Sequence, residues 1–316
     1  MNATETILEM PAQNKNDLTG ELAGCVSRAA VIRRDEPMAR HTTLRVGGPA
    51  DVYVEPATEA DLAGVLKFCG AHGVPLLVMG RGSNLLVRDG GFRGVIICLA
   101  HANFGRIEVD GERLRCGAGA KLKNVAVEAK RNGLSGVEFL EGIPGTVGGA
   151  LRMNAGAMGG QTFDLVESVR LMDFNGNVRE LAPEEMAVAY RGCATLKDYV
   201  ALGAVFKCKP APRGEIEARM QAFSEKRWAS QPAAPSAGCL FKNPAQIPAG
   251  QLVDELGLKG MRVGGAVVSA EHGNFIVNDG SATARNILDL IDLLKQRAKT
   301  GRGIELETEV EIIGEE

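Results

Sequence analysis

The sequence lacks the residue spacings that metal sites and disulfide frameworks require. Its seven cysteines, at positions 25, 69, 98, 116, 193, 208 and 239, are odd in number, widely scattered and never arranged as C-x-x-C. Its four histidines show no ligand spacing such as H-x-x-x-H. This pattern argues against stapled secreted domains and against zinc sites. We therefore expect no metal, an organic cofactor if there is one, and cysteines that mostly pack as small buried residues.

Runs of like charge and long apolar segments are absent as well. The chain has 36 basic and 39 acidic residues, a formal net charge of −3, and charges of both signs interspersed without a basic stripe. This distribution disfavours nucleic-acid and anionic-lipid binding. No segment approaches the roughly 20 apolar residues that span a bilayer, and the start MNATETILEM does not resemble a leader. We predict a cytoplasmic monomer that binds a small molecule, with neither nucleic acid nor membrane as a partner.

The hydrophobic pattern predicts an α+β chain with a domain boundary near Pro210. Residues 1–25 are polar and without sustained periodicity, so we expect a loosely ordered, flexible extension there. Alternating segments around Asp110-Gly111 and Asn175-Gly176 predict two β-hairpins. Further strands are predicted at 44–56 (a bent pair), 74–80, 94–100, 200–208, 264–269, 274–278 and 304–313, and helices at 58–73, 121–133, 213–229, 250–256 and 281–299. A larger β-rich part is thus followed by a smaller α/β part.

Two glycine-rich segments are the strongest sign of a ligand site. Residues 80–91, GRGSNLLVRDGG, follow a predicted strand, and residues 142–160, GIPGTVGGALRMNAGAMGG, contain little that is bulky in their first half. Exposed backbone N–H groups in such loops bind anions, although tight turns or close strand crossings explain glycine equally well. Neither loop has the G-x-x-x-x-G-K-[ST] pattern, and GAGAKL lacks the last glycine of a dinucleotide fingerprint. Another phosphate-binding architecture is therefore favoured.

A series of longer motifs points to a family. TLRVGGPAD, GRGSNLLVRDGG, GVEFLEGIPGTVGGALRMNAGAMGG, AYRG, PSAGCLFKNP and LETEV occur in this order over almost the whole chain after residue 30. Together they closely resemble the UDP-N-acetylenolpyruvoylglucosamine reductases, flavoenzymes of peptidoglycan precursor synthesis. The resemblance implies an FAD-binding domain of the vanillyl-alcohol-oxidase type at 26–210, in subdomains of about 26–100 and 101–210, and a smaller α/β substrate-binding domain at 211–316. The short connection after Tyr190 is similar to the shorter form of the family, which lacks a substrate-covering tyrosine loop.

The resemblance also implies the ligands and where they bind. FAD would be held non-covalently, NADPH would donate the hydride, and a UDP-sugar, UDP-N-acetylglucosamine enolpyruvate, would be reduced to UDP-N-acetylmuramate. The residues implied for FAD are Arg81, Gly82, Ser83, Asn84, Leu85, Gly145, Thr146, Gly148, Gly149, Asn154, Ala155 and Gly156. Those implied for the substrate, besides the catalytic groups, are Tyr190, Arg227, Lys242 and Asn243.

The implied reaction needs three catalytic groups. A hydride reaches the β-carbon of the enolpyruvyl ether, negative charge develops toward the carboxylate, and a proton must reach the α-carbon. By resemblance, Arg191 is the cation on the substrate carboxylate, and Glu307 is the acid that polarises the intermediate or tunes the proton donor. The sequence alone does not choose among the four glutamates of 303–311, which we expect on one face of a strand with the apolar residues on the other.

Cys239 takes the position where the family usually has a serine that protonates the α-carbon. An arbitrary cysteine in a cytosolic protein is more often a packing residue than a reactive one. A thiol, with a usual pKa of about 8.5, is intrinsically a more willing acid than an alcohol, but it is longer and more easily oxidised. Within this motif we expect Cys239 to be the proton donor.

Two other classes of function remain open from the sequence. A flavin oxidase of the same fold often anchors its flavin through a histidine or cysteine in the glycine loop, and GRGSN offers neither. A flavin or nucleotide-sugar binding module that lost activity with the serine is the other class. Release of flavin on heating excludes a covalent oxidase, and bleaching of the flavin by NADPH excludes an inactive module.

Overall fold

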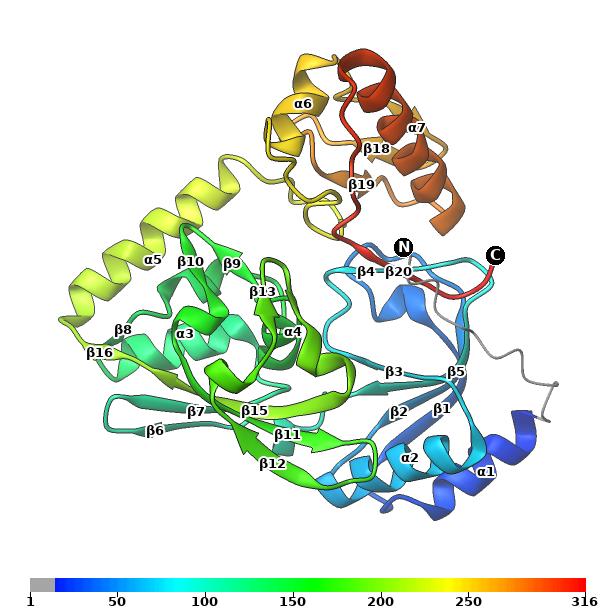
Figure 1. Ribbon diagram of the computed structural model, residues 1–316, viewed down its shortest axis with the longest axis vertical. Helices are drawn as coiled ribbons and strands as arrows, with labels where there is room; N and C mark the ends of the chain where they lie inside the picture. Colours follow the sequence, from blue (N-terminus) through cyan, green and yellow to red (C-terminus); the bar gives the residue numbers. More distant parts are fainter. Residues whose placement is uncertain (1–14) are drawn as a thin grey trace.

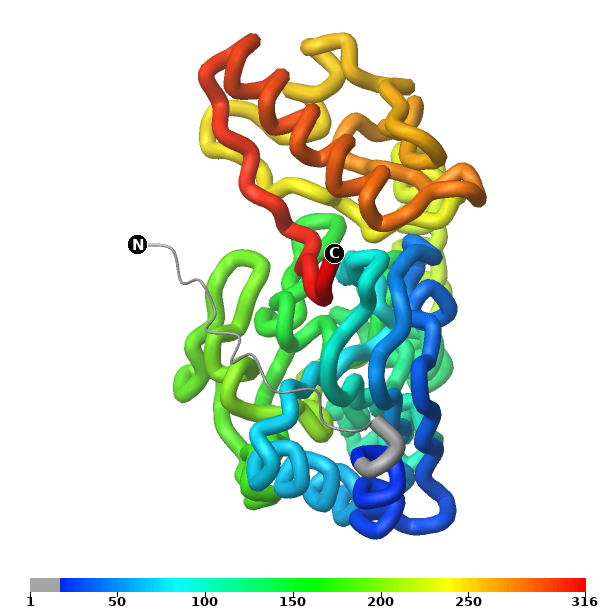
Figure 2. Tube along the Cα trace, turned by 90° about the vertical axis from the view of Figure 1, so that its right-hand side faces the viewer, coloured from blue at the N-terminus to red at the C-terminus, as the bar shows by residue number. Residues whose placement is uncertain are grey.

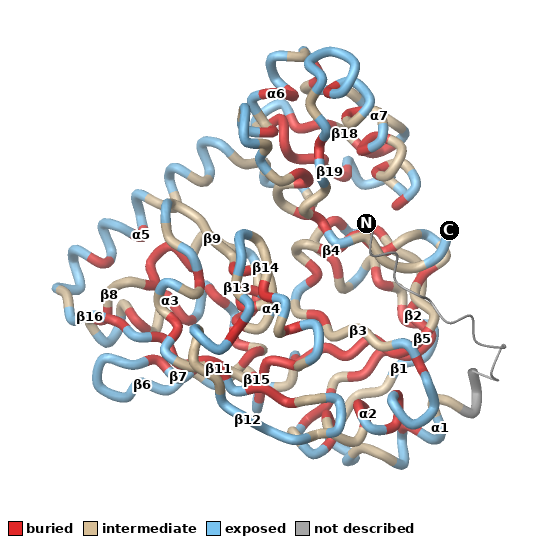
Figure 3. Tube along the Cα trace, viewed as in Figure 1, coloured by how far each residue is buried: buried red, intermediate tan, exposed pale blue. Residues whose placement is uncertain are grey.

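The chain folds into three parts, two of which lie side by side beneath the third in Figure 1. A computed structural model describes residues 15–316. The first two parts are each built around a β-sheet, and the long helix α5 (Arg213–Trp228) leads from the second part to the third. Most buried residues of the first two parts belong to one core, and a second core lies in the third part and includes Leu44, Val46 and Leu86 of the first part (Figure 3).

The first part is a four-stranded sheet with helices on one face. β1 pairs antiparallel with β2, whereas β5 runs parallel to both β2 and β3. The helices bury Leu22 and Leu62 in the same cluster as Val52 and Ile97 of the sheet, and the opposite face carries a smaller cluster around Tyr53. The elements, sheet order first, are β1 (Val31–Pro37), β2 (Pro49–Glu55), β5 (Phe92–Cys98), β3 (Leu76–Met79), α1 (Lys15–Gly24), α2 (Glu59–His72), β4 (Leu85–Val87), and the 3-10 turns η1 (Met38–Arg40) and η2 (Ala102–Phe104).

Two sequence predictions are wrong in this part. Residues 15–24 form helix α1 and Leu22 is fully buried, so the flexible extension expected at 1–25 does not describe its second half, while residues 1–14 lie outside the described residues. The strand pair expected at 44–56 contains only β2. Arg45 and Gly47 have positive φ angles of 58° and 128°, which an extended strand does not adopt. The partner of β2 is β1, which the hydrophobic pattern did not reveal.

The predicted start of helix α2 is confirmed by its cap. The Thr58 side chain accepts a hydrogen bond from the Asp61 amide, and the Asp61 carboxylate accepts one from the Thr58 amide, which forms a capping box. The helix ends at Gly73, whose φ of 63° lies in the left-handed region that favours glycine.

The second part is an antiparallel five-stranded sheet with helices packed into its core. The two predicted hairpins, β6–β7 and β11–β12, are confirmed, and Gly111 and Gly176 adopt positive φ angles of 58° and 81° at their turns. The sheet order is β12 (Val178–Leu181), β11 (Val166–Asp173), β15 (Tyr199–Lys207), β7 (Arg113–Gly117) and β6 (Ile107–Asp110). The helices are α3 (Leu122–Arg131) and α4 (Val147–Arg152). Smaller elements are β8 (Leu134–Ser135) with β16 (Lys209–Pro210), β9 (Gly156–Ala157) with β10 (Gly160–Gln161), β13 (Val188–Ala189) with β14 (Gly192–Cys193), η3 (Glu138–Gly142), η4 (Thr162–Asp164), η5 (Pro183–Glu185) and η6 (Ala194–Lys197).

The third part combines two helices with a small antiparallel sheet. Its apolar core contains Ile287, Leu290, Ile291 and Leu294, the apolar face that the sequence predicts for the long helix. The predicted helices and the strands at 264–269 and 274–278 are confirmed. The elements are α6 (Ala249–Glu255), β17 (Arg262–Val263), β18 (Ala266–Val268), β19 (Ile276–Asn278) and α7 (Ala284–Arg302).

The C-terminal segment leaves the third part and returns to the first (Figures 1 and 2). The strand predicted over 304–313 is wrong in most of its length. Only β20 (Glu311–Ile313) is a strand, and it pairs in parallel with β4. Asp89 provides a second link between these parts, because its carboxylate accepts hydrogen bonds from the Ala284 and Arg285 amides at the start of α7, at 2.9 and 2.8 Å. A negative charge is favourable at this end of a helix.

Within the described residues, no helix has the length and apolar character needed to cross a bilayer.

The burial of Leu22 predicts that α1 is part of the folded core. Leu22→Ala should lower the free energy of unfolding by about 2–5 kcal/mol, because a fully buried leucine leaves a cavity. The exposed neighbour Glu21 gives a matched control, since Glu21→Ala on the same helix should change stability little. Urea denaturation followed by circular dichroism measures both. Equal transition midpoints for the two variants would show that α1 does not contribute to the core.

Candidate active site

Three side chains from distant parts of the sequence lie together. Arg191 stands in the tight turn between β13 and β14, Cys239 in the connection between α5 and α6, and Glu309 in the C-terminal segment. Arg191 Nε lies 2.9 Å from Glu309 Oε1, and these side chains are only 22% and 14% exposed. The charges of both act on the thiol of Cys239. We call these three residues the Arg191–Cys239–Glu309 cluster.

The surroundings of Cys239 keep its thiol protonated. Burial raises the pKa of Cys239 to about 12, and the negative charge of Glu309 acts in the same direction. Arg191 and a hydrogen bond with the side chain of Asn274 oppose this shift in the pKa. At neutral pH the thiol therefore carries its proton, which is the state that a proton donor requires.

Glu309 is a carboxylate held in surroundings that disfavour its charge. Burial raises the pKa of Glu309, while the positive charges of Arg191 and Lys242 oppose that rise. In a poorly solvated place, each charge of an ion pair is tolerated only while its partner stays beside it, because removing one partner leaves an uncompensated buried charge. The positions of Arg191 and Glu309 therefore depend on each other.

An irregularity in the backbone brings Glu309 to the side of Cys239. Residues 307 and 308 pair with the chain next to Cys239, since the Lys242 amide donates to the Glu307 carbonyl and Phe241 bridges to Thr308. The next two amides, of Glu309 and Val310, both point at the Leu240 carbonyl, at 2.7 and 3.4 Å. Successive amides of a regular strand point to opposite sides. The alternation that would place all the glutamates on one face is thus broken.

The structure places Glu309, rather than the predicted Glu307, beside Arg191 and Cys239. The side chain of Glu307 is 71% exposed and pairs with Lys242 Nζ at 2.5 Å. The sequence prediction assumed a regular strand over 304–313 and chose the acid directly after Leu306. Because the strand is interrupted, the acid that faces the cluster lies two residues later.

Arg191 is held by its backbone and by two neighbours. Its φ of 57° lies in the left-handed region, which this tight turn requires and which residues other than glycine adopt rarely. Its guanidinium carbon lies 4.9 Å from the ring centre of Tyr190, whose side chain is largely exposed. A methyl group added at Gly156 would lie 3.4 Å from Arg191 Nη1, so the second glycine segment packs directly against the guanidinium.

The two glycine-rich segments face each other. A methyl group added at Gly80 would lie 2.5 Å from Thr146 Oγ1, and one added at Gly145 would lie 3.8 Å from Ser83 Oγ. Gly82 has a φ of 58°, and a methyl group there would lie 2.4 Å from the His41 carbonyl. The loops at 80–85 and 145–149 therefore form one cradle with little side-chain bulk, which suits the phosphates of a dinucleotide.

The side chain of Asn154 forms hydrogen bonds with three other residues of the chain. Its Nδ2 donates to Gln161 Oε1 at 3.1 Å and to the Ala189 carbonyl at 3.2 Å, and its Oδ1 accepts from the Phe163 amide at 3.2 Å. The φ of Asn154 is also positive, at 38°. This residue therefore ties the second glycine segment to the turn that carries Arg191.

The predicted substrate residues Arg227 and Asn243 have contacts outside the cluster. Burial lowers the pKa of Arg227, the nearby charge of Glu141 opposes this, and a methyl group added at Gly142 would lie 3.8 Å from Arg227 Cδ. Asn243 Oδ1 accepts a hydrogen bond from the Ala249 amide at 3.0 Å, which caps the start of α6.

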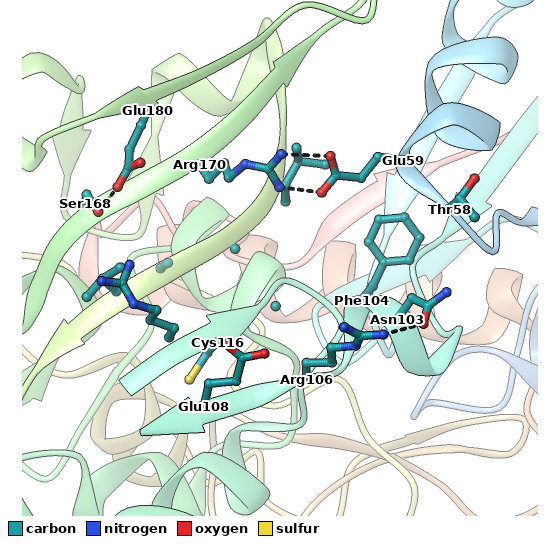
Figure 4. Close-up of a pocket in the computed structure, with 16 residues that line it drawn as sticks. Thr58, Glu59, Asn103, Phe104, Arg106, Glu108, Cys116, Ser168, Arg170 and Glu180 are labelled. Atoms are coloured by element: carbon teal, nitrogen blue, oxygen red, sulfur yellow. Dashed lines mark hydrogen bonds and ion pairs between the residues drawn. The ribbon is translucent and has the colours of Figure 1, made fainter. Parts of the chain in front are cut away.

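A cavity of about 540 Å³ lies elsewhere, between the start of α2 and the five-stranded sheet of the second part (Figure 4). Several of its polar side chains are paired with one another: Arg170 with Glu59, Ser168 with Glu180, and Arg106 with Asn103. None of the predicted site residues lines it. In residues 15–316, no group of His, Cys, Asp and Glu side chains is arranged to hold a metal.

Comparison with known proteins decides the family. Residues 50–182 match the FAD binding domain model, and residues 231–313 match the model for the C-terminal domain of UDP-N-acetylenolpyruvoylglucosamine reductase. The protein of that name from Clostridioides difficile is 44% identical over 305 residues, covering 96% of this chain and 100% of the relative. The chain belongs to this reductase family. The family member from Geobacter metallireducens is 45% identical over 309 residues, covering 98% of this chain and 99% of the relative.

A solved structure of the family agrees with the fold. The crystal structure of UDP-N-acetylenolpyruvylglucosamine reductase from Thermus caldophilus is 39% identical, has a TM-score of 0.78, and covers 90% of this chain and 99% of that chain. The predicted fold class is therefore confirmed: an α+β chain with an FAD-binding domain of the vanillyl-alcohol-oxidase type and a smaller second domain. The chain is an FAD-containing oxidoreductase.

Sequence reasoning missed Glu309 in the cluster and Asn274 next to it. Glu309 was one of several glutamates in an apparently regular strand. Asn274 is buried, bonds the Phe241 amide through Oδ1 and the Phe241 carbonyl through Nδ2, and also bonds the Cys239 thiol. Its only signal in the sequence was a polar residue at the start of an apolar run.

The cluster predicts that Glu309, and not Glu307, controls the acidity of Cys239. Glu309→Gln removes a negative charge that raises the thiol pKa, so the pKa should fall and iodoacetamide should modify Cys239 several-fold faster at alkaline pH. A fall of one pKa unit gives about tenfold more thiolate. Mass spectrometry of the Cys239 peptide measures the rate separately from the other cysteines. Glu307→Gln is the matched control, and a larger effect from it than from Glu309→Gln would contradict this assignment.

Proposed function

We propose that the chain reduces UDP-N-acetylglucosamine enolpyruvate to UDP-N-acetylmuramate in the cytoplasm, with NADPH as the hydride donor. The family assignment supports the reaction, and the Arg191–Cys239–Glu309 cluster beside Gly156 is the observation that carries it. The cluster supplies a cation, a carboxylate and a protonated acid, which are the three groups that reduction of an enolpyruvyl ether requires. Bound FAD supplies the hydride to the β-carbon when it has been reduced.

In this proposal the two glycine loops hold FAD. The segments Arg81–Leu85 and Gly145–Gly149 bind the pyrophosphate through their backbone amides, and Asn154–Gly156 lie along the flavin. Their mutual approach and the packing of Gly156 against Arg191 support this arrangement, because they put the flavin segment next to the catalytic cation. Non-covalent binding is expected, since the loop offers no histidine or cysteine for attachment.

Arg191 binds the carboxylate of the enolpyruvyl group in this proposal. Its planar guanidinium matches a carboxylate that gains negative charge in the transition state. Because Nε is next to Glu309, the terminal nitrogens are the ones directed at the substrate. Glu309 thus acts on the substrate through Arg191, by fixing the plane of the guanidinium.

Cys239 delivers the proton to the α-carbon. Its S–H bond breaks as the C–H bond forms, and the thiolate that remains is stabilised by Arg191, whose charge lowers the pKa of the thiol. A thiol with a pKa of about 12 does not release its proton to water at neutral pH. The carbanionic α-carbon is far more basic than water, so the proton leaves only when the substrate has been reduced at the β-carbon.

The outer part of the substrate lies along the entrance to the cluster in this proposal. Lys242 and Arg227 are the cations for the diphosphate, and Tyr190 and Asn243 contact the sugar or its amide. The exposed Tyr190 ring over Arg191 and the position of Lys242 between Glu307 and Glu309 support this direction of binding.

The two half-reactions give the test. Under anaerobic conditions NADPH should bleach the flavin of the wild type, and UDP-N-acetylglucosamine enolpyruvate should then restore its colour. Cys239→Ala should bleach normally but recover about 10²–10⁴-fold more slowly, because only proton delivery is lost. Cys239→Ser should retain much of the recovery. Normal recovery in Cys239→Ala would remove Cys239 from the reaction, and no recovery in the wild type would refute the proposed substrate.

A further inference from the structure

Asn84 is the residue at which the first glycine loop, the second glycine segment and the C-terminal segment meet. Its side-chain Nδ2 donates to the Glu309 carbonyl at 3.1 Å and to Met153 Sδ at 3.6 Å. Its own carbonyl accepts a hydrogen bond from the Glu311 amide at 3.1 Å. One residue of the loop proposed for the FAD pyrophosphate therefore holds the backbone of the buried acid.

The C-terminal segment changes its pairing partner at Glu309, which explains why the Glu309 carbonyl receives its hydrogen bond from a side chain. Up to Thr308 the segment pairs with the chain that follows Cys239, and from Glu311 it pairs with β4. The Glu309 amide donates a hydrogen bond to the Leu240 carbonyl. The Glu309 carbonyl lies at the crossover, where a shielded carbonyl without a donor would be costly. The amide of Asn84 provides that donor.

We propose that Asn84 is a positioning residue for Glu309 rather than a side-chain ligand of FAD. This inference rests on the proposed function. By fixing the Glu309 backbone, the Asn84 amide fixes the carboxylate that lies 2.9 Å from Arg191 and acts on Cys239. The place of the acid is thereby set by the same loop that binds the cofactor.

The chemistry of an amide argues against a direct bond from the Asn84 side chain to the pyrophosphate. A primary amide has two N–H donors and one acceptor oxygen. Both donors are engaged, with the Glu309 carbonyl and with Met153 Sδ. The remaining Oδ1 can only accept a hydrogen bond, so it repels a phosphate oxygen. The backbone amide of the loop stays the part of Asn84 that suits the anion.

The experiment measures the acidity of Cys239 in Asn84→Leu, which keeps similar bulk but has no donor. The Glu309 carbonyl loses its partner, the carboxylate moves from its place, and its effect on the thiol pKa weakens. Iodoacetamide should therefore modify Cys239 several-fold faster at alkaline pH, approaching the rate in Glu309→Gln. The measurement is made on the protein with FAD and after removal of FAD, so it does not depend on turnover.

Flavin binding and the half-reactions complete the test. Asn84→Leu should keep its FAD and be reduced by NADPH at nearly the wild-type rate. Recovery of the flavin by substrate should slow about 10- to 100-fold, as expected when a catalytic group is misplaced by a fraction of an ångström to one ångström. Should Asn84→Leu fail to fold, Asn84→Ala removes the same donor without adding bulk and is measured in the same way.

Met153→Leu is the matched control, since it removes the sulfur acceptor but leaves the bond to Glu309. It should behave as wild type in all three measurements. Loss of FAD from the Asn84 variants with an unchanged Cys239 rate would show that Asn84 is a flavin ligand only, and equal effects of Met153→Leu and Asn84→Leu would show a general packing defect. Either result overturns the inference. Failure of the proposed function is distinguishable, because the wild-type flavin would then not respond to the substrate, whatever the alkylation rates show.

Discussion

The ion pair between Arg191 and Glu309 joins the turn β13–β14 to the C-terminal segment, and the rest of the site is arranged around it. Each partner is held by an asparagine from a different glycine segment. Asn154 donates to the Ala189 carbonyl, just before the turn with Arg191, and Asn84 donates to the Glu309 carbonyl. The backbones near both charged residues are therefore hydrogen-bonded to the glycine segments that we propose for FAD. A site of this kind is preorganised before the substrate arrives, which is how electrostatic catalysis gains most.

The thiol at position 239 changes the physical problem that the site has to solve. A serine hydroxyl is a very weak acid in any surroundings, so it keeps its proton without help. A cysteine with its usual pKa of about 8.5 would be partly ionised at moderately alkaline pH and open to oxidation. Burial and the charge of Glu309 raise the pKa to about 12, which makes the thiol resemble a hydroxyl in its protonation state. The positive charge of Arg191 stabilises the thiolate that forms when the proton passes to the substrate.

Local signals in the sequence were sufficient for many of the elements, and family motifs were sufficient for the FAD cofactor. Thr58, the two Asx-Gly turns and the apolar face of α7 each specify structure through nearby residues, so they could be recognised. The strand β1 was missed because its residues VIRRDEP carry four charges in succession, which interrupt the alternation of apolar and polar residues. Glu309 was missed because its orientation depends on two amides sharing the Leu240 carbonyl. That is a long-range contact, and no periodicity within the segment encodes it.

A double-mutant cycle on Arg191 and Glu309 tests most directly whether the pair acts as a unit. The measured quantity is the rate at which substrate restores the colour of the reduced flavin in Arg191→Gln, Glu309→Gln and the double variant. Because Glu309 acts largely through Arg191 in this account, Glu309→Gln should cost much less in the Arg191→Gln background than in the wild type. The coupling free energy should be about 1–3 kcal/mol. Rate losses that multiply, with a coupling near zero, would contradict the account.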